Sequence, residues 1–178
     1  LKQSKKQYHD AVLALIEYPF DALYFTGFKS LDDAQCALMG ARAVYDGPVL
    51  ISLVPNEEGM FSGGRTLSEG VALCDEYGAD VIGVVSDAPA RVLVGFAKEM
   101  ASVTDKPLLV DVSVRRKDRR QFEPTDENPY PTADAMVELV VRLRAQGVQF
   151  LRASGAATPA YTGALLATVG GSDVVVPQ

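Results

Sequence analysis

Two aspartates lie at the ends of two successive apolar segments that have the character of buried strands. Asp87 follows the first segment and Asp111 lies near the end of the second. On adjacent parallel strands, these carboxylates could act as acid and base, or hold a hard divalent cation together with Ser86 and Ser113. The structural alternative is that Asp87 caps the helix opening at Ala88, while Asp111 faces a partner in a loop.

A cation stands at the end of the last apolar segment of this kind. Arg152 could bind a carboxylate or a phosphate there, close to a helix start at Thr158. It could equally pair with Asp111 or Asp87 as an internal salt bridge. Both interpretations place the arginine at the same end of the sheet as the two aspartates.

The other polar motifs are weaker. Ser62–Arg65 is glycine-rich and could cradle an anion, but it lacks the Lys-Ser/Thr of a P-loop, which favours a flexible loop. His9 is the single histidine and is expected on the surface of an N-terminal helix, which disfavours His-based triads and zinc sites. The basic cluster at 115–120 is expected to be a solvated loop.

Composition describes an ordinary globular protein. The 178 residues, 48% hydrophobic and 22% charged, suit a single domain spanning 1–178. A net charge of −6 disfavours nucleic acid and anionic membranes as partners. Cys36 and Cys74 lie on apolar helix faces, which predicts buried free thiols and a reducing compartment. With no apolar run near the ~20 residues of a membrane span, a cytoplasmic location is expected.

Short apolar runs alternate with longer amphipathic segments along the whole chain. Each run is rich in Val, Ile or Leu on both faces, which is typical of buried parallel strands. The expected strands are Ala22–Thr26, Val49–Val54, Val81–Val85, Leu108–Val112 and Val148–Leu151, with a weaker one at Val174–Val176.

Helix signals separate these strands. Ser30 and Thr66 are expected N-caps, the second as part of a capping box with Glu69, and Thr158 precedes a proline at a helix start. Further helices are expected at about 4–17, 89–103 and 132–146. The alternation predicts an α/β fold with a parallel sheet, either part of a (β/α)8 barrel or an open doubly wound sheet. The irregular stretch at about Ser113–Pro131 follows a strand end and is either a lid or a surface insertion.

Several segments resemble, in order, motifs of the homocysteine S-methyltransferase family. Gly78–Pro89 is similar to the family's Gly-Ala-x-x-Ile-Gly-Val-Asn-Cys-Ser-x-Pro, and Gly147–Pro159 to its closing strand with Gly-Gly-Cys-Cys-Gly-Thr-Thr-Pro. The other matching segments are Asp21–Ala34, Pro48–Glu69 and Lys106–Val110. The resemblance implies the C-terminal part, about five strands, of a (β/α)8 TIM-type barrel. The N-terminal strands are then missing from this chain, and further polypeptide or a partner chain is needed to close the barrel.

In that family, three cysteine thiolates bind a zinc ion that activates the thiol of homocysteine for methyl transfer. The first ligand position falls on Ser86, and the paired positions fall on Ser154 and Gly155. The glutamate that holds the substrate's amino group falls on Thr26, and the family's Tyr-Pro-Asn segment falls on 111–113. Serine is a poor zinc ligand at neutral pH and glycine offers no side chain. The resemblance therefore implies a methyltransferase-like chain without bound zinc or any other cofactor.

Three functions remain open at this point. The chain is a transferase that still methylates a thiol without a thiolate zinc site, or a degenerate homologue that binds a small polar or anionic molecule, or a non-catalytic partner subunit. No residue is assigned a catalytic or metal-binding role. The expected ligand-binding residues are Thr26, Ser86, Asp87, Asp111, Arg152 and Ser154.

Overall fold

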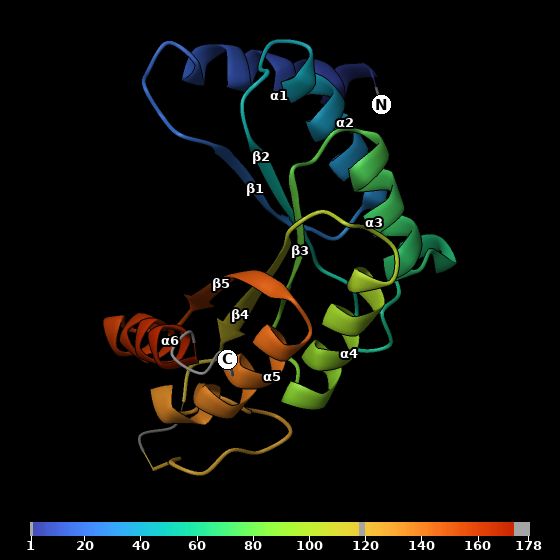
Figure 1. The fold of residues 1–178 in the computed structure, drawn as a ribbon. Helices are drawn as coiled ribbons and strands as arrows, with labels where there is room; N and C mark the ends of the chain where they lie inside the picture. The colour runs from blue at the N-terminus through green and yellow to red at the C-terminus, as the bar shows by residue number, and fades with distance from the viewer. Residues whose placement is uncertain (1, 118–119, 173–178) are drawn as a thin grey trace, which may run out of the picture.

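A computed structural model describes residues 2–117 and 120–172 as a regular alternation of strands and helices (Figure 1). The strands are β1 (Leu23–Phe28), β2 (Val49–Leu53), β3 (Val81–Ser86), β4 (Leu108–Val114) and β5 (Val148–Gly155). The helices are α1 (Lys2–Leu15), α2 (Leu31–Arg42), α3 (Leu67–Glu76), α4 (Ala90–Ala101), α5 (Val137–Ala145) and α6 (Pro159–Ser172). Short 3-10 turns, η1 (Ser62–Gly64) and η2 (Ala133–Met136), precede α3 and α5.

All five strands pair in parallel, in the order β1-β2-β3-β4-β5. The five expected strands are thus confirmed. The last one is longer than expected, because Arg152, Ala153 and Ser154 continue the pairing with β4 although they are not an apolar run. The weaker strand expected at Val174–Val176 lies outside the described residues.

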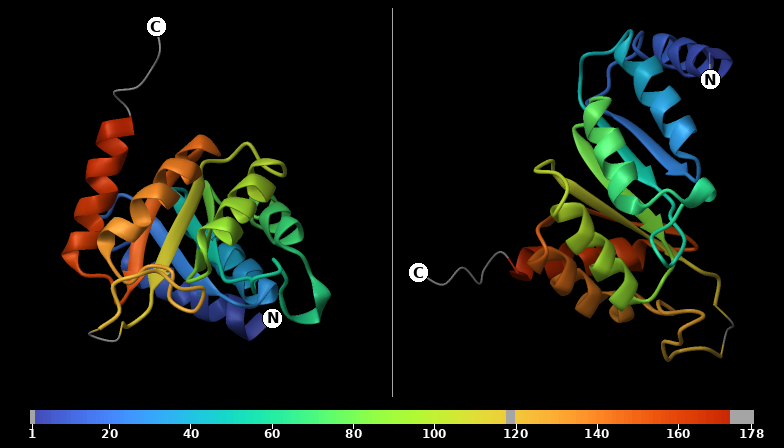
Figure 2. Two further views of the ribbon diagram at one scale, coloured as in Figure 1. Left: turned by 90° about the horizontal axis from the view of Figure 1, so that it is seen from below. Right: turned by 90° about the vertical axis from the view of Figure 1, so that its right-hand side faces the viewer.

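The strand order also decides between the two architectures left open by the sequence. A doubly wound sheet reverses its strand order at a switch point, so that its right-handed crossovers place helices on both faces. Here the order never reverses, and each helix from α1 to α6 contacts the next one along the chain. The helices follow one another round the outside of a curved sheet (Figure 2). The chain therefore forms part of a barrel of the (β/α)8 type.

The helix starts follow the predicted caps. The Ser30 hydroxyl accepts a hydrogen bond from the amide of Asp33 at 3.3 Å, so that it caps α2. Thr66 and Glu69 form the expected capping box at α3, with the Glu69 carboxylate accepting the Thr66 amide at 2.7 Å. Helix α6 begins at Pro159.

The core lies between the sheet and the helices. Each strand contributes alternate residues to it, represented by Leu23, Ile51, Ile82, Val110 and Val148, which are all at most 7% exposed. Because side chains alternate along a strand, the residues between them point to the opposite, inner face of the curved sheet. That alternation fixes which residues can meet at a site inside the barrel.

Arg42 ties the amino-terminal ends of the strands together. Its guanidinium donates to the carbonyl oxygen of Gly78 through Nε at 2.9 Å and through Nη2 at 2.6 Å. It also reaches the carbonyls of Tyr45 and Gly47, and pairs with Asp80 at 2.6 Å. Asp80 in turn accepts the amide of Val49, the first residue of β2, at 2.8 Å. This network is structural, because it lies at the end of the sheet opposite to the expected site.

The loop after β4 is anchored at its far end. Residues 128–131 are buried, and the Tyr130 hydroxyl donates to the carbonyl of Ala88 at 3.0 Å. The Tyr161 hydroxyl on α6 donates to the Tyr130 carbonyl at 2.9 Å. These bonds attach the returning part of the loop to the segment between β3 and α4 and to α6. Residues 115–117 and 120 are exposed, as expected for a solvated loop.

Other expectations concern isolated residues. Cys36 and Cys74 are both buried and free of disulfide bonds, as predicted. His9 lies on α1 with 35% of its side chain exposed, next to Asp10. Within the described residues, no helix has both the length and the apolar character needed to cross a membrane.

Candidate functional site

Polar side chains occupy the inner face of the sheet, from the second residue of β1 and the middle of β4 and β5 to the carboxyl ends of the strands. The interior of a (β/α)8 barrel is normally filled by branched apolar residues, while its ligands bind at the carboxyl end. Strand alternation directs these residues to the inner face: Tyr24, Thr26, Ser52, Asp111, Ser113, Arg152 and Ser154. They are the candidate site.

Asp111 and Arg152 form its charged centre. They are paired across β4 and β5, and Arg152 Nη1 donates to Asp111 Oδ2 at 2.9 Å. The Asp111 side chain is only 1% exposed, whereas that of Arg152 is 48% exposed. Asp111 Oδ1 has no hydrogen-bond partner among the described residues. The salt bridge that the sequence left open is therefore formed with Asp111, and the arginine remains accessible from the inner face.

Arg152 also contacts the opposite edge of the sheet. The carbon at the centre of its guanidinium lies 5.6 Å from the centroid of the Tyr24 ring, at cation–π distance. Tyr24 belongs to β1 and Arg152 to β5, the two outermost strands. Side chains from the two edges meet only if the sheet curls strongly, so this contact closes the inner face into a concave surface.

Three hydroxyl groups extend this centre along β1 and β2. The Tyr24 hydroxyl lies 2.9 Å from Ser52 Oγ, and Ser52 Oγ donates to Thr26 Oγ1 at 3.0 Å. Ser52 is fully buried, whereas Thr26 is exposed. The network therefore leads from a buried serine to an accessible threonine.

Asp87 and Ser86 have other partners. Asp87 Oδ2 accepts from Arg115 Nε at 2.6 Å, and this hydrogen bond lowers the pKa of the Asp87 carboxyl. Arg115 also donates to the carbonyl of Glu127, in the loop after β4. Ser86 Oγ accepts a hydrogen bond from the amide of Ala88 at 3.1 Å. The expected alternative of Asp87 as a helix cap is wrong, because Pro89 is the N-cap of α4 and no side chain caps it. The Asp87 carboxylate faces the loop after β4 instead.

Ser154 and Gly155 occupy the end of β5, beside Ser113 and Val114 of β4. Gly155 has a φ of +69°, and a Cβ atom built on it would lie 2.6 Å from the Val114 carbonyl oxygen. The backbone therefore requires glycine at this position. A cysteine there would be strained by its own conformation as well as by the contact.

A thiolate zinc ion does not fit these residues. Within the ranges described, no three His, Cys, Asp or Glu side chains come together as a metal site. Cys36 and Cys74 lie inside α2 and α3, and burial raises the pKa of the Cys74 thiol to about 12. Burial therefore disfavours the thiolate form that a metal ligand requires. The residues at the family's three ligand positions, Ser86, Ser154 and Gly155, therefore do not fit a thiolate zinc ion.

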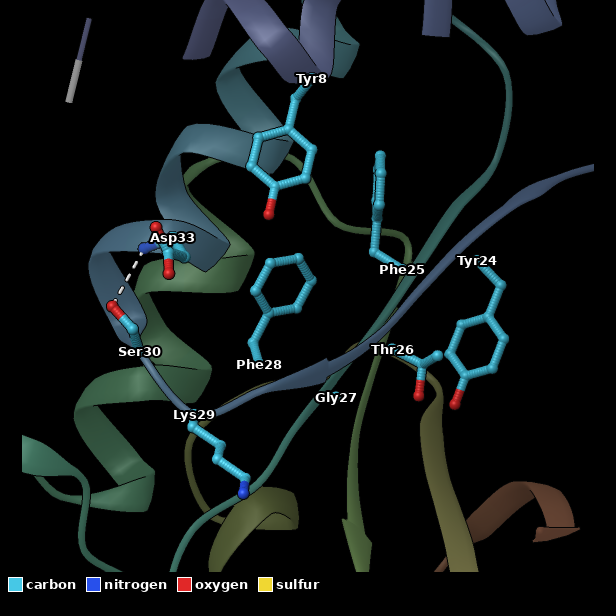
Figure 3. Close-up of a pocket in the computed structure, with 9 residues that line it drawn as sticks. All are labelled: Tyr8, Tyr24, Phe25, Thr26, Gly27, Phe28, Lys29, Ser30 and Asp33. Atoms are coloured by element: carbon cyan, nitrogen blue, oxygen red, sulfur yellow. Dashed lines mark hydrogen bonds between the residues drawn. The ribbon is translucent and has the colours of Figure 1, made fainter. Parts of the chain in front are cut away.

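An open pocket of about 480 Å³ surrounds the carboxyl end of β1 (Figure 3). On one side of the strand, Tyr8, Phe25 and Phe28 form a cluster whose ring centroids are 6.0 to 6.4 Å apart. Burial, followed by the charge of Asp33, raises the pKa of the Tyr8 hydroxyl. On the other side of the strand lie the hydroxyls of Tyr24 and Thr26. The two sides differ in chemistry, apolar outside and hydrogen-bonding inside.

The structure is similar to TIM-barrel proteins of known structure. The homocysteine methyltransferase MmuM from Escherichia coli superposes in its apo form with a TM-score of 0.73, at 16% identity, over 94% of this chain and 56% of that one. Its metallated form gives 0.71 at 16% identity, over 92% of this chain and 51% of that one. Chloride-inhibited dihydrodipicolinate synthase from Acinetobacter baumannii, complexed with pyruvate, gives 0.58 at 14% identity, over 94% and 54%.

These likenesses show the fold alone. No family model matches the chain, and no curated protein matches it at the significance required. The chain spans about half the length of the structures it matches, which agrees with five consecutive strands of a TIM barrel. The expected relationship to homocysteine methyltransferases is thus confirmed at the level of the fold.

Two of the residues that build this site were not expected from the sequence. Tyr24 and Ser52 connect Arg152 to Thr26, yet both occur inside otherwise apolar strands. The sequence feature that could have identified Tyr24 is the alternation of side chains between the two faces of a strand. Tyr24 lies two residues before Thr26 and therefore shares its face. Asp111, Arg152 and Thr26 belong to one connected group, whereas Asp87 is engaged by Arg115.

Proposed function

We propose that this chain binds a small anionic molecule, carrying a carboxylate or a phosphate, on the inner face of its half-barrel. The observation that supports this most directly is the state of Arg152. A guanidinium has five N–H donors, and one Nη1–Oδ2 bond joins it to Asp111. The remaining donors belong to a side chain that is 48% exposed.

Asp111 does not cancel the attraction for an anion. Its side chain is 1% exposed and that of Arg152 is 48% exposed, so an incoming anion meets the cation rather than the acid. The pair acts as a support that holds the guanidinium in one orientation, and the Tyr24 ring supports it from β1. A preorganised arginine of this kind is suited to two-pronged recognition of planar oxyanions.

The fold resembles that of a homocysteine methyltransferase, and methyl transfer to a thiol is the second candidate function. The TM-score of 0.73 favours it. The side chains do not, because Ser86, Ser154 and Gly155 cannot replace thiolates. On this proposal, further polypeptide or a partner chain supplies the remaining strands and the other wall of the site.

One experiment tests the first proposal. The melting temperature of the full-length protein is measured with rising acetate or inorganic phosphate, for wild type and for Arg152→Gln. We expect a ligand-dependent rise in the wild type, by linkage, that is largely absent in Arg152→Gln. Arg91→Gln is the matched control, because Arg91 is exposed on α4 and pairs with Asp126 away from the inner face. An equal rise in wild type and Arg152→Gln contradicts the proposal.

A second experiment separates the two candidates. Elemental analysis of the purified full-length protein gives its zinc content, and methyl transfer is assayed with homocysteine as acceptor and several methyl donors. Less than about a tenth of an equivalent of zinc, with no transfer, agrees with anion binding alone. One equivalent of zinc together with transfer favours the methyltransferase and requires ligands other than those described.

A further inference from the structure

The hydroxyl chain on β1 and β2 has a direction, which follows from counting protons. Ser52 has one hydroxyl proton, and it is donated to Thr26 Oγ1. The Ser52–Tyr24 hydrogen bond must therefore use the Tyr24 proton, with Ser52 as the acceptor. Ser52, fully buried, is then satisfied on both sides.

Thr26 is the accessible end of this chain. Its oxygen already accepts one hydrogen bond, and its own proton has no acceptor among the described residues. The Tyr24 and Thr26 hydroxyls lie side by side beneath β1 (Figure 3). Because Tyr24 donates inward to Ser52, Thr26 is the hydroxyl of the three that is left to donate to a ligand.

Arg152 and Thr26 together present donors to the same face. Arg152 packs on the ring of Tyr24, and Thr26 follows two residues later, roughly 7 Å farther along the strand. A guanidinium cannot accept a hydrogen bond, and the uncommitted proton of Thr26 also requires an acceptor. A charged amino group has hydrogen-bond donors and no acceptor, so it does not match a site that presents the donors of Arg152 and Thr26.

We infer that Thr26 is a second ligand contact and that the ligand group between β1 and β5 is an oxyanion, with one oxygen on Arg152 and another on Thr26. This inference rests on the proposed function and specifies the polarity of the same site. It also reverses the role that the sequence resemblance gave to this position, where a glutamate holds the substrate's amino group. In this chain, Thr26 at the same position favours a ligand group that accepts a hydrogen bond.

The test uses three probes, inorganic phosphate, acetate and methylammonium, titrated calorimetrically into full-length protein. Thr26→Val keeps the shape of the side chain and removes the hydroxyl, whereas Thr26→Ser restores it. We expect Thr26→Val to weaken phosphate or acetate binding by about tenfold or more, because it deletes a hydrogen bond to a charged group. Thr26→Ser is expected to stay within about threefold of the wild type. The control is Thr168→Val, because the Thr168 hydroxyl donates within α6 to the carbonyl of Ala164.

The outcomes separate the inference from the proposal beneath it. If Arg152→Gln abolishes anion binding while Thr26→Val matches the wild type, the inference is wrong and the anion site stands. If methylammonium binds in a manner that depends on Thr26, the inferred polarity is wrong. If the wild type binds neither phosphate nor acetate, both fail. Phosphate and acetate, compared with each other, show which oxyanion the site prefers.

Discussion

Arg152 on β5 lies over the ring of Tyr24 on β1, with 5.6 Å between the guanidinium carbon and the ring centroid. These residues belong to the first and the last strand of a five-stranded sheet. Their side chains can therefore meet only because the whole sheet is strongly curved. The contact also supports a cation over an aromatic face, at the centre of the surface where a ligand is proposed to bind.

The Asp111–Arg152 pair predicts a coupled loss of stability. Arg152→Gln removes the partner of a carboxylate that is 1% exposed, so we expect the free energy of unfolding to fall by about 1–3 kcal/mol. Asp111→Asn combined with Arg152→Gln leaves no uncompensated charge, and it should recover part of that loss. Urea unfolding of the two single variants and the double variant completes a double-mutant cycle. Additive effects would show that the pair is not coupled.

The conformation of Gly155 predicts that a side chain at this position destabilises the fold. Gly155→Ala places a Cβ 2.6 Å from the Val114 carbonyl oxygen, at a φ of +69°, so we expect destabilisation by about 1–3 kcal/mol. Gly163→Ala on α6 is the matched control, because nothing lies within 4 Å of its added Cβ. There, alanine should stabilise the helix by up to about 1 kcal/mol. Equal effects of the two substitutions on the melting temperature would contradict the described end of β5.

The Asp87–Arg115 pair predicts a contribution to acid sensitivity. The hydrogen bond from Arg115 lowers the pKa of Asp87 in the folded protein. The pair therefore contributes stability above the unfolded pKa, near ~3.9, and loses it as the pH falls through the folded pKa. Both side chains are about two-fifths exposed, so the contribution should be below about 1 kcal/mol.

Asp87→Asn tests this contribution by comparing urea midpoints at pH 6 and pH 3. At pH 6, the variant should be slightly less stable than the wild type. Between pH 6 and pH 3, its urea midpoint should fall by less than that of the wild type. High salt should shrink the difference, since both groups are partly exposed. An unchanged pH dependence in the variant would argue against the ion pair.

Arg42 predicts a large structural effect far from the site. Arg42→Ala removes its bonds to the carbonyls of Gly78, Tyr45 and Gly47 and its pairing with Asp80, so we expect a loss of about 2–4 kcal/mol. Arg91→Ala should change stability by less than about 0.5 kcal/mol, because it breaks one exposed pair. Chemical denaturation compares the two. A similar small effect of both would mean that the Arg42 network does not form.

The cysteines predict slow thiol chemistry. Burial raises the pKa of Cys74 to about 12, and the Cys36 side chain is also buried. Because the thiolate is the reactive form, iodoacetamide at pH 8 should label neither residue in the folded protein within minutes and both in urea. Mass spectrometry counts the adducts. Rapid native labelling of Cys74 would contradict its place in the core.

The architecture was largely predictable because strand–helix alternation and apolar runs are local signals. Val81–Val85 and Leu108–Val112 identified β3 and β4, and the capping box of Thr66 identified the start of α3. The residues after Leu151 that extend β5 did not look like a strand in the sequence, because they are not an apolar run. Their place in the strand is fixed by pairing with β4, which is a tertiary interaction.

The candidate site was predictable only in its residue types. Asp111, Arg152 and Thr26 were expected as ligand-binding residues, and the Asp111–Arg152 salt bridge was one of the alternatives. The partners of Thr26 were not expected. Tyr24 and Ser52 are joined by a hydrogen bond between residues 28 positions apart, which no local pattern encodes. Likewise, no local pattern indicated that the Asp87 carboxylate would bind Arg115, 28 positions later in the chain.

The contact between the two edge strands also bears on how the chain folds. Every strand pairs with the next one in sequence, so each neighbouring unit can form through short-range closure. The meeting of Tyr24 and Arg152 has no such short route, because all five strands must be in place before the edges approach each other. Substitutions at this contact should accelerate unfolding and leave the refolding rate nearly unchanged, as befits an interaction formed late. The residues proposed to receive the ligand would then be assembled last.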